Sequence, residues 1–429
     1  MSDEMSHTIF SPSHDEGAGE LHPAHAGISD LKLHLLTTAK RLATPWQVAF
    51  ERSMRLAKMP LPDGVLLDPA CGSGIQLAAH MLTLKRSGIG VELEPEVGRA
   101  AAANLWRVAT YEKSENPSWL ENSRVLIGDG CQSAEVCSHI AIEQVALLHL
   151  DPARPQNSRT HGIEEMSPQL GEVFTAWKSH LRQTDRGPAM LLDLSPRLLG
   201  EQRAQVESIV EEHWPSIGKT WEWTSRGGGR IDRLSLWLGA ASTPGIGMRY
   251  VRIPPRWDEA AIIVESSQNE ENWSAENQHS ISPRSPRRGE YLTIVDSALV
   301  SSGLAAEWLK QNLDARDRQN WLAVEGRRPM IYHSQPLSSV ALESRLLFQT
   351  SGQIVALCQS PLDMENIEEY VEICYDNNLT HITVRAPLDD AVQPQLQSAF
   401  HRMLAGGGSG GSGFIVSDPL SGGLIICRE

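Results

Sequence analysis

The chain has 429 residues, enough for two or three domains that each bury a core. It is 41% hydrophobic and 21% charged, as expected of a globular protein, and it holds no apolar run long enough to cross a membrane. Its formal net charge of -15 argues against nonspecific DNA binding, because counterion release needs a basic surface, although a local basic patch could still contact RNA.

The first 63 residues predict a tail and a helical segment. Residues 1–28 contain no Lys or Arg, which argues against a signal peptide, and their acidic, Gly-, Pro- and Ser-containing sequence predicts a disordered acidic tail. Its four histidines could instead form a metal-binding arm: His7, His14, His22 and His25. Residues 29–63 predict an N-terminal helical segment, in which Thr44 would be the N-cap of a helix.

The six cysteines contain no Cys-x-x-Cys pair, so we expect no zinc site, no other metal and no disulfide framework. Scattered thiols of this kind are typical of a reduced compartment, and we expect a cytoplasmic protein.

Residues 64–245 alternate strand and helix, the pattern of a parallel sheet covered by helices. The predicted strands are 65–67, 89–92, 124–127, 145–150, 189–194, 220–224 and 234–238, and the predicted helices are 75–85, 95–106, 168–181 and 201–213. We interpret the fourth strand as an unbroken apolar run buried on both faces. The connection 225–230 is too short for a helix, so the last two strands form an antiparallel hairpin. The fold class is therefore α/β, with a seven-stranded Rossmann-like sheet.

The remaining sequence predicts a linker and a second domain. Residues 246–289 include a stretch rich in Ser, Glu, Asn and Pro and are interpreted as a linker or polar loop. Residues 290–429 predict a smaller α/β domain. Within it, Gly406–Gly413 could be a hinge or a passive loop.

Acidic residues follow the first four predicted strands: Asp68, Glu92, Asp129 and Asp151. Because the carboxyl ends of parallel strands meet at one edge of a sheet, where ligands bind, we expect these four to face one ligand. Glu92 could accept hydrogen bonds from both hydroxyls of a ribose, and Asp129 could accept one from an adenine amine.

The turn after the first strand contains Asp68, Ala70, Gly72 and Gly74. Its glycines would let a ligand approach the backbone closely. Leu77 stands where a dinucleotide-binding turn has its third glycine, and no Gly-Lys-Ser/Thr follows, so a P-loop is excluded.

This Asp-x-x-x-Gly-x-Gly turn and the hairpin-terminated sheet resemble class I S-adenosylmethionine-dependent methyltransferases. The resemblance implies S-adenosylmethionine as the cofactor, with its amino-acid moiety over Gly72 and Gly74, its ribose on Glu92 and its adenine on Asp129. The residues implied to bind it are Asp68, Ala70, Gly72, Gly74, Glu92, Asp129 and Asp151.

The segment Asp151-Pro152-Ala153-Arg154 resembles the Asp/Asn-Pro-Pro-aromatic signature of methyltransferases that act on planar exocyclic amines. It departs from that signature at Ala153 and Arg154, which removes the aromatic that stacks on a base. The implied catalytic residues are Asp151, which would position the acceptor, Pro152, whose carbonyl would accept a hydrogen bond, and Arg154. Arg154 would orient the substrate through a phosphate or carboxylate.

The Asp-Pro-Ala-Arg variant is similar to that of a prokaryotic methyltransferase group with a C-terminal THUMP-like domain. Ser167-Pro168, the Trp223–Trp237 hairpin and the segment from Tyr291 to Val300 also resemble that group. By analogy the resemblance implies an RNA substrate, such as tRNA, methylated at a base nitrogen and presented by the THUMP-like domain. A protein or small-molecule substrate and a non-catalytic adaptor that binds S-adenosylmethionine remain alternatives. We expect no membrane partner, and the oligomeric state is left open.

Overall fold

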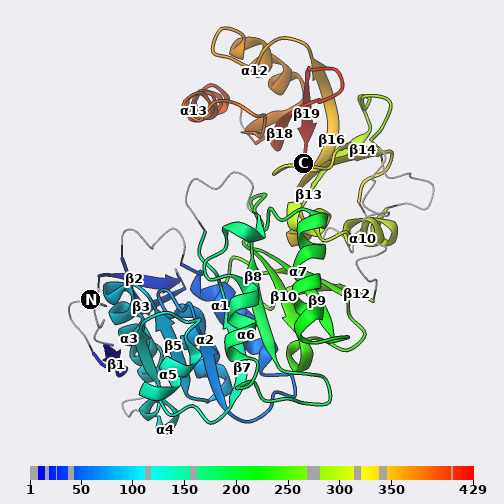
Figure 1. Ribbon diagram of the computed structural model, residues 1–429. Coiled ribbons are helices and arrows are strands. Elements are labelled where there is room, and N and C mark those ends of the chain that lie inside the picture. Colours follow the sequence, from blue (N-terminus) through cyan, green and yellow to red (C-terminus); the bar gives the residue numbers. More distant parts are fainter. Residues whose placement is uncertain are drawn as a thin grey trace. The chain divides into compact units, whose positions relative to one another are not determined.

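The computed structural model divides the chain into two compact units (Figure 1). It describes residues 8–14, 19–25, 27–36, 43–111, 117–154, 162–267, 281–313, 320–337, 345–406 and 409–429. The first unit consists of residues 1–226 and 232–269, and the second of residues 227–231 and 270–429. No helix among the described residues is long and apolar enough to cross a membrane.

The first unit is built on a sheet whose strand order is β1-β6-β5-β4-β7-β8-β10-β9-β11-β12. The strands are β1 (Ile9–Phe10), β4 (Val65–Asp68), β5 (Gly88–Glu92), β6 (Arg124–Ile127), β7 (Val145–Leu150), β8 (Met190–Leu194), β9 (Lys219–Ser225), β10 (Arg233–Leu238), β11 (Met248–Arg252) and β12 (Ile262–Ser266). Strands β6, β5, β4, β7 and β8 run parallel, and β10 is antiparallel to both β8 and β9. The predicted Rossmann-like sheet and its antiparallel hairpin, β9 and β10, are therefore confirmed, but the hairpin does not end the sheet.

Helices cover this sheet. They are α1 (Trp46–Leu56), α2 (Ile75–Leu84), α3 (Pro95–Thr110), α4 (Ser118–Glu121), α5 (Ser133–His139), α6 (Leu170–Trp177) and α7 (Gly200–His213). Helix α2 contacts both α1 and α3, whereas α6 contacts α5 and α7, which gives the two helical layers expected of right-handed crossovers. The alanines of α3 (Ala100–Ala103) are buried, and their small side chains permit close packing against α2 and the sheet.

Two segments differ from their predicted state. The tail predicted for residues 1–28 contains β1, which pairs with β6, and β2 (Glu20–His25), which pairs with β3 (Ile28–Leu35). The prediction of disorder is wrong for these described residues, because pairing with an open sheet edge or with a neighbouring strand can order a polar segment. Alternate residues Leu31 and Leu33 of β3 are buried, which adds apolar burial to that pairing. His7 lies outside the described residues.

The predicted linker also begins too early. Residues 248–252 form β11, which is buried along its whole length and runs parallel to β9, and β12 pairs with β11. The chain therefore extends the sheet beyond the predicted seven strands before it leaves the first unit.

The second unit has a sheet of order β14-β15-β13-β16-β19-β18-β17. Its strands are β13 (Tyr291–Val295), β14 (Asn320–Ala323), β15 (Met330–His333), β16 (Phe348–Cys358), β17 (Leu379–Val384), β18 (Gly411–Ser417) and β19 (Leu424–Arg428), and its helices are α9 (Ser297–Ser301), α10 (Ala305–Asn312), α12 (Ile367–Asp376) and α13 (Val392–Leu404). Helices α12 and α13 pack on a core that includes Tyr370, Phe400 and Ile426. The predicted smaller α/β domain is confirmed. Of the segment 406–413, residues 411–413 begin β18, and 407–408 lie outside the described residues.

Candidate functional site

A cavity of about 700 Å³ opens at the carboxyl ends of β4, β5, β6 and β7 in the first unit. Its size is that of a small-molecule or cofactor site. All three predicted catalytic residues line it, and so do all but one of the predicted cofactor residues: Asp68, Ala70, Gly72, Glu92, Asp129 and Asp151. The exception is Gly74.

The turn after β4 explains why its two glycines differ. Gly72 has a φ of 50°, lines the cavity, and has open space within 4 Å of the position that a Cβ would take. Gly74 has a φ of 69° and precedes α2; a Cβ there would lie 3.0 Å from Cβ of Ala101 in α3. Gly72 therefore leaves room beside the cavity, whereas Gly74 permits the contact between two helices.

Two carboxylates present acceptors to the cavity. Glu92 accepts hydrogen bonds from the Gly72 amide through Oε2 (2.9 Å) and from the Glu94 amide through Oε1 (3.0 Å), so each oxygen keeps a free lone pair. Burial raises the pKa of Glu92. Asp129 is exposed, and its Oδ1 accepts from the Cys131 amide (2.9 Å). These acids are fixed by the backbone and can still accept hydrogen bonds from a ligand.

Asp68 has a different surrounding from the one predicted. Its Oδ1 accepts a hydrogen bond from the Ala70 amide (3.2 Å), and its Oδ2 lies 2.7 Å from Nδ1 of His149 in β7. Nε2 of His149 lies 3.4 Å from Oδ2 of Asp193 in β8. All three side chains are buried. Asp68 therefore lines the cavity and also connects the cofactor turn to a network of buried charged side chains, which includes His149 and Asp193.

His149 is held in its charged form by these two acids. Burial alone would lower its pKa, but Asp68 and Asp193 together raise it to about 9. The same contact, together with an ion pair to the buried Arg52 of α1, holds the pKa of Asp193 far below its ordinary value. A protonated imidazole therefore lies between the side chains of Asp68 and Asp193 at neutral pH.

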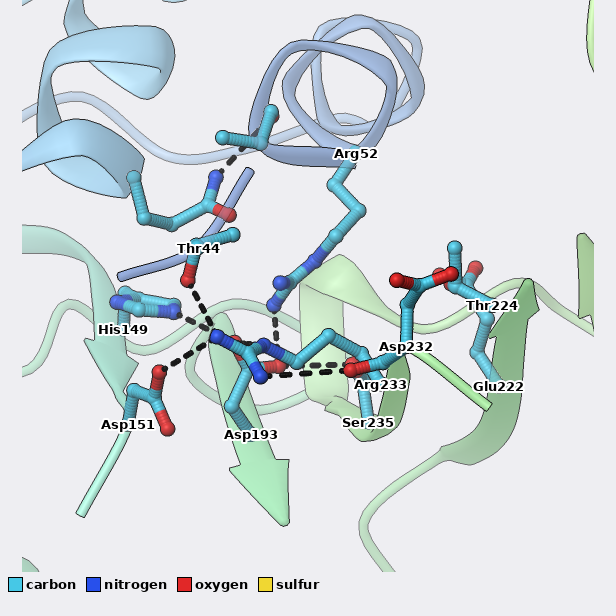
Figure 2. Close-up of polar contacts among 12 residues, drawn as sticks. Thr44, Arg52, His149, Asp151, Asp193, Glu222, Thr224, Asp232, Arg233 and Ser235 are labelled. Carbon is cyan, nitrogen blue, oxygen red and sulfur yellow. Dashed lines mark hydrogen bonds and ion pairs between the residues drawn. The ribbon is translucent and has the colours of Figure 1, made fainter. Parts of the chain in front are cut away.

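Arg233 connects this network of buried charged side chains to Asp151, at the end of the cavity where the methyl acceptor is expected (Figure 2). Its Nη2 lies 3.6 Å from Oδ2 of Asp151 and donates a hydrogen bond to the Thr44 hydroxyl (2.8 Å), and its Nε lies 3.9 Å from Oδ2 of Asp193. The expectation that Thr44 caps α1 is wrong, because Pro45 occupies the cap position without a side-chain cap bond. Thr44 instead fixes the Arg233 guanidinium.

The loop after β7 carries the predicted acceptor residues. Ala153 and Ser167 exchange two backbone hydrogen bonds, Ala153 N–H to Ser167 O (2.8 Å) and Ser167 N–H to Ala153 O (2.9 Å). They hold the loop against the segment that precedes α6. The Asp151 side chain is one-third exposed, Pro152 is buried, and Arg154 is half-buried. Asp151 therefore offers a carboxylate to the cavity while Arg233 restrains it.

Sequence reasoning missed the charged residues beneath the cavity: Arg52, His149, Asp193 and Arg233. The strand Val145–Leu150 was interpreted as an unbroken apolar run, but it contains His149. A histidine in a strand that is buried on both faces was the available signal, because buried charges are paired.

The alternative of a metal-binding histidine arm finds no support among its described histidines, His14, His22 and His25. Within the described ranges, no group of three or more His, Cys, Asp or Glu side chains could hold a metal ion. His22 lies 3.4 Å from Glu20, and His14 contacts the Trp106 ring edge-on.

No protein-family model matches the sequence, and no curated protein matches it. The structure is similar to that of a protein from Porphyromonas gingivalis W83 that carries a provisional description as a methyltransferase, with a TM-score of 0.57 at 14% identity. The match covers 94% of this chain and 84% of that one, and so includes residues of both units. The chain has a Rossmann-like methyltransferase fold.

Two further solved structures match about half of the chain. One is a provisional class I S-adenosylmethionine-dependent methyltransferase from Listeria monocytogenes, with a TM-score of 0.33, 14% identity and coverage of 50% of this chain and 67% of that one. The other is human methyltransferase-like protein 13 in complex with SAH, with a TM-score of 0.30, 19% identity and coverage of 48% and 85%. Scores this low add nothing to the fold assignment.

Proposed function

We propose that the chain is an S-adenosylmethionine-dependent methyltransferase. The observation that carries the proposal is that one cavity is lined by Gly72, Glu92 and Asp129 at three strand ends and by Asp151 at a fourth. Ligands of open α/β sheets bind at this edge. The acids could hold the ribose and the adenine of the cofactor, and Asp151 lies where an acceptor could be oriented.

The residues present fit this cofactor. The open space beside Gly72 gives a ligand access to the backbone, and both oxygens of Glu92 can each accept one further hydroxyl. Bound S-adenosylmethionine would supply an electrophilic methyl group on a sulfonium, whose positive charge suits a cavity with several carboxylates.

The acceptor end has its own chemistry. The Asp151 carboxylate would accept a hydrogen bond from an acceptor amine and so direct its lone pair, and the Pro152 carbonyl would accept a second. The Arg233 guanidinium, 3.6 Å from Asp151, limits the orientations of that carboxylate.

The substrate we propose is RNA, methylated at a base nitrogen. An arginine cluster in the second unit supports this: Arg327 and Arg328, between β14 and β15, and Arg385, after β17. Burial and then the charges of Arg385 and Arg327 lower the pKa of Arg328, so the three guanidinium groups lie near one another. Among the described residues none of them forms an ion pair, although Glu429 attracts Arg385. A concentrated positive charge on an acidic chain suits a phosphate backbone.

The THUMP-like character of residues 290–429 is part of this proposal and rests on the resemblance of its motifs. The net charge of -15 favours a protein or small-molecule substrate as the second candidate. A non-catalytic adaptor is less well supported, because it would not need the acceptor carboxylate of Asp151.

Transfer of a labelled methyl group from S-adenosylmethionine into deproteinised cellular RNA tests the proposal. We expect label in RNA with the wild type and about a 100-fold loss or more in Asp151→Ala, while cofactor binding stays within a few-fold. Asp258→Ala, which removes an exposed partner of Arg256, is the matched control and should keep full activity. Methyl transfer that persists when the RNA of the substrate pool has been completely digested with nuclease beforehand would refute the RNA assignment. Equal loss of cofactor binding and turnover in Asp151→Ala would refute the role of Asp151.

A further inference from the structure

Arg154 lines the cavity with one edge of its guanidinium group unused. Its Nε and Nη2 atoms are both buried, and among the residues that the structure describes neither has a hydrogen-bond partner. These two N–H groups point in nearly the same direction and form the side-on edge of the guanidinium. That edge gives two parallel hydrogen bonds to a carboxylate or a phosphate.

A buried donor edge without an acceptor is costly, since each N–H has lost its water without gaining a partner. Burial lowers the pKa of Arg154, and the charge of Asp151 offsets that effect only in part. The nearby carboxylate of Asp151 lies instead within 3.6 Å of Arg233 (Figure 2). An oxyanion brought by the substrate would satisfy the Arg154 edge.

The surroundings decide where such an anion can bind. Asp129, Glu172 and Glu92 also line the cavity and would repel it from the rest of the wall. The other cavity-lining arginine, Arg233, already contacts Thr44, Asp151 and Asp193. His149 also lines the cavity and already lies between Asp68 and Asp193. Among the described residues that line the cavity, Arg154 is therefore the cation available to an anion, and it follows Asp151 in the same loop.

We propose that Arg154 binds the phosphate of the nucleotide that is methylated, so that the enzyme recognises a nucleotide and not a nucleoside or a free base. The inference rests on the proposed function, and it names the chemical unit recognised beside the acceptor. Phosphate is favoured over carboxylate because every nucleotide of the proposed RNA substrate carries a phosphate and none carries a carboxylate.

Calorimetric titrations of the full chain, saturated with S-adenosylhomocysteine, test this inference. The ligands are the four nucleoside 5′-monophosphates and the four nucleosides. We expect at least one monophosphate to bind about tenfold or more tightly than its nucleoside, since a bidentate charged contact is worth well over 1.4 kcal/mol. In Arg154→Met the ratio should fall to about one, and in Arg154→Lys part of it should remain, because lysine keeps the charge and loses the fork.

Three results would overturn the inference: a ratio near one in the wild type, an unchanged ratio in Arg154→Met, or stronger competition by acetate than by inorganic phosphate. Binding of S-adenosylhomocysteine is measured for each variant as well. If S-adenosylhomocysteine binds but the phosphate preference is absent, the role of Arg154 fails while the proposed function stands. Its binding to Arg154→Met also shows that this variant is folded. A short RNA that binds more tightly than the mononucleotide would place the phosphate in a chain. Equal affinity would assign it to a free nucleotide, and both results support the role of Arg154.

Discussion

His149 carries a positive charge near the carboxyl end of a buried strand, and two carboxylates make this possible. Asp68 and Asp193 lie on either side of its ring, at 2.7 and 3.4 Å. With Arg52, Arg233 and Asp151, the group contains three cations and three carboxylates, so the buried charges balance. Loss of one of the fully buried members, Arg52, Asp68, His149 or Asp193, would leave an uncompensated charge, which is strongly destabilising in a protein interior. Asp151 is one-third exposed, so its loss is tolerated better.

This pairing predicts a pH dependence of stability. The pKa of His149 is raised from 6.5 to about 9, so its contribution is fully present below pH 6.5 and is lost as the pH rises through 9. The shift corresponds to about 3 kcal/mol. We therefore expect the unfolding free energy of the wild type, measured by urea titration, to fall between pH 7 and 10 more steeply than that of His149→Gln. Parallel pH profiles would show that His149 is not charged in the folded protein.

Substitution of the two glycines of the cofactor turn should have different main effects, one on stability and the other on ligand binding. Gly74→Ala should lower the melting temperature, because its Cβ would press on Ala101 of α3 at 3.0 Å and the φ of 69° disfavours a side chain. Gly72→Ala should also be strained, yet its larger effect should be on S-adenosylhomocysteine binding, because its Cβ would enter open space beside the cavity. Thermal melts with and without ligand distinguish the two. An identical ligand-induced shift in wild type and Gly72→Ala would contradict the placement of the cofactor.

Helix α1 forms buried ion pairs with two strands of the sheet close to the site. Its Arg52 pairs with Asp193 of β8, and three residues later Arg55 lies 2.7 Å from Glu222 of β9. Arg249 of β11 approaches the other oxygen of Glu222 at 3.2 Å. Helix α1 therefore contacts β8 and β9 directly, and Glu222 of β9 connects it to the added strand β11.

Glu222→Gln should be severely destabilising. The carboxylate is fully buried, and its neutralisation removes the buried partner that Arg55 and Arg249 share, at a cost of about 3–5 kcal/mol. Each arginine then keeps only a partly exposed acid, Glu51 or Glu265. Urea unfolding measures the change. Asp258→Asn, in an exposed ion pair with Arg256, is the control and should leave stability unchanged. A loss below about 1 kcal/mol for Glu222→Gln would show that this network does not hold β11 in place.

The predictable elements are those whose own sequence indicates a strand or a helix. The central strands follow each other with helices between, and the acids of the site come directly after strand ends, so Glu92, Asp129 and Asp151 could be named from the sequence. Strands β1, β2 and β11 could not, because their order comes from pairing with distant segments and not from their composition. The same holds for Arg52, whose partner Asp193 lies on another strand far along the chain.

At the scale of the whole molecule, charge is distributed unevenly. The chain has a net charge of -15, yet the second unit gathers Arg327, Arg328 and Arg385. If this arginine cluster contacts phosphates, each arginine replaced by alanine should lower the slope of log affinity against log salt by about one for RNA binding. Binding to a short RNA over a range of salt concentrations measures this. Replacement of Arg402, an exposed arginine of α13, by alanine should leave the slope unchanged. If Arg402→Ala changed the slope as much as the cluster variants do, the cluster would have no specific role in RNA binding.

The central claim is that the cavity at the strand ends of the first unit binds S-adenosylmethionine, and calorimetric titration of the full chain with S-adenosylhomocysteine tests it most directly. We expect one ligand per chain. Glu92→Ala should weaken binding about tenfold or more, because hydrogen bonds to a charged group are lost, whereas Glu94→Ala, at a neighbouring exposed position, should bind as the wild type does. No binding to the wild type, or equal losses in both variants, would contradict the account.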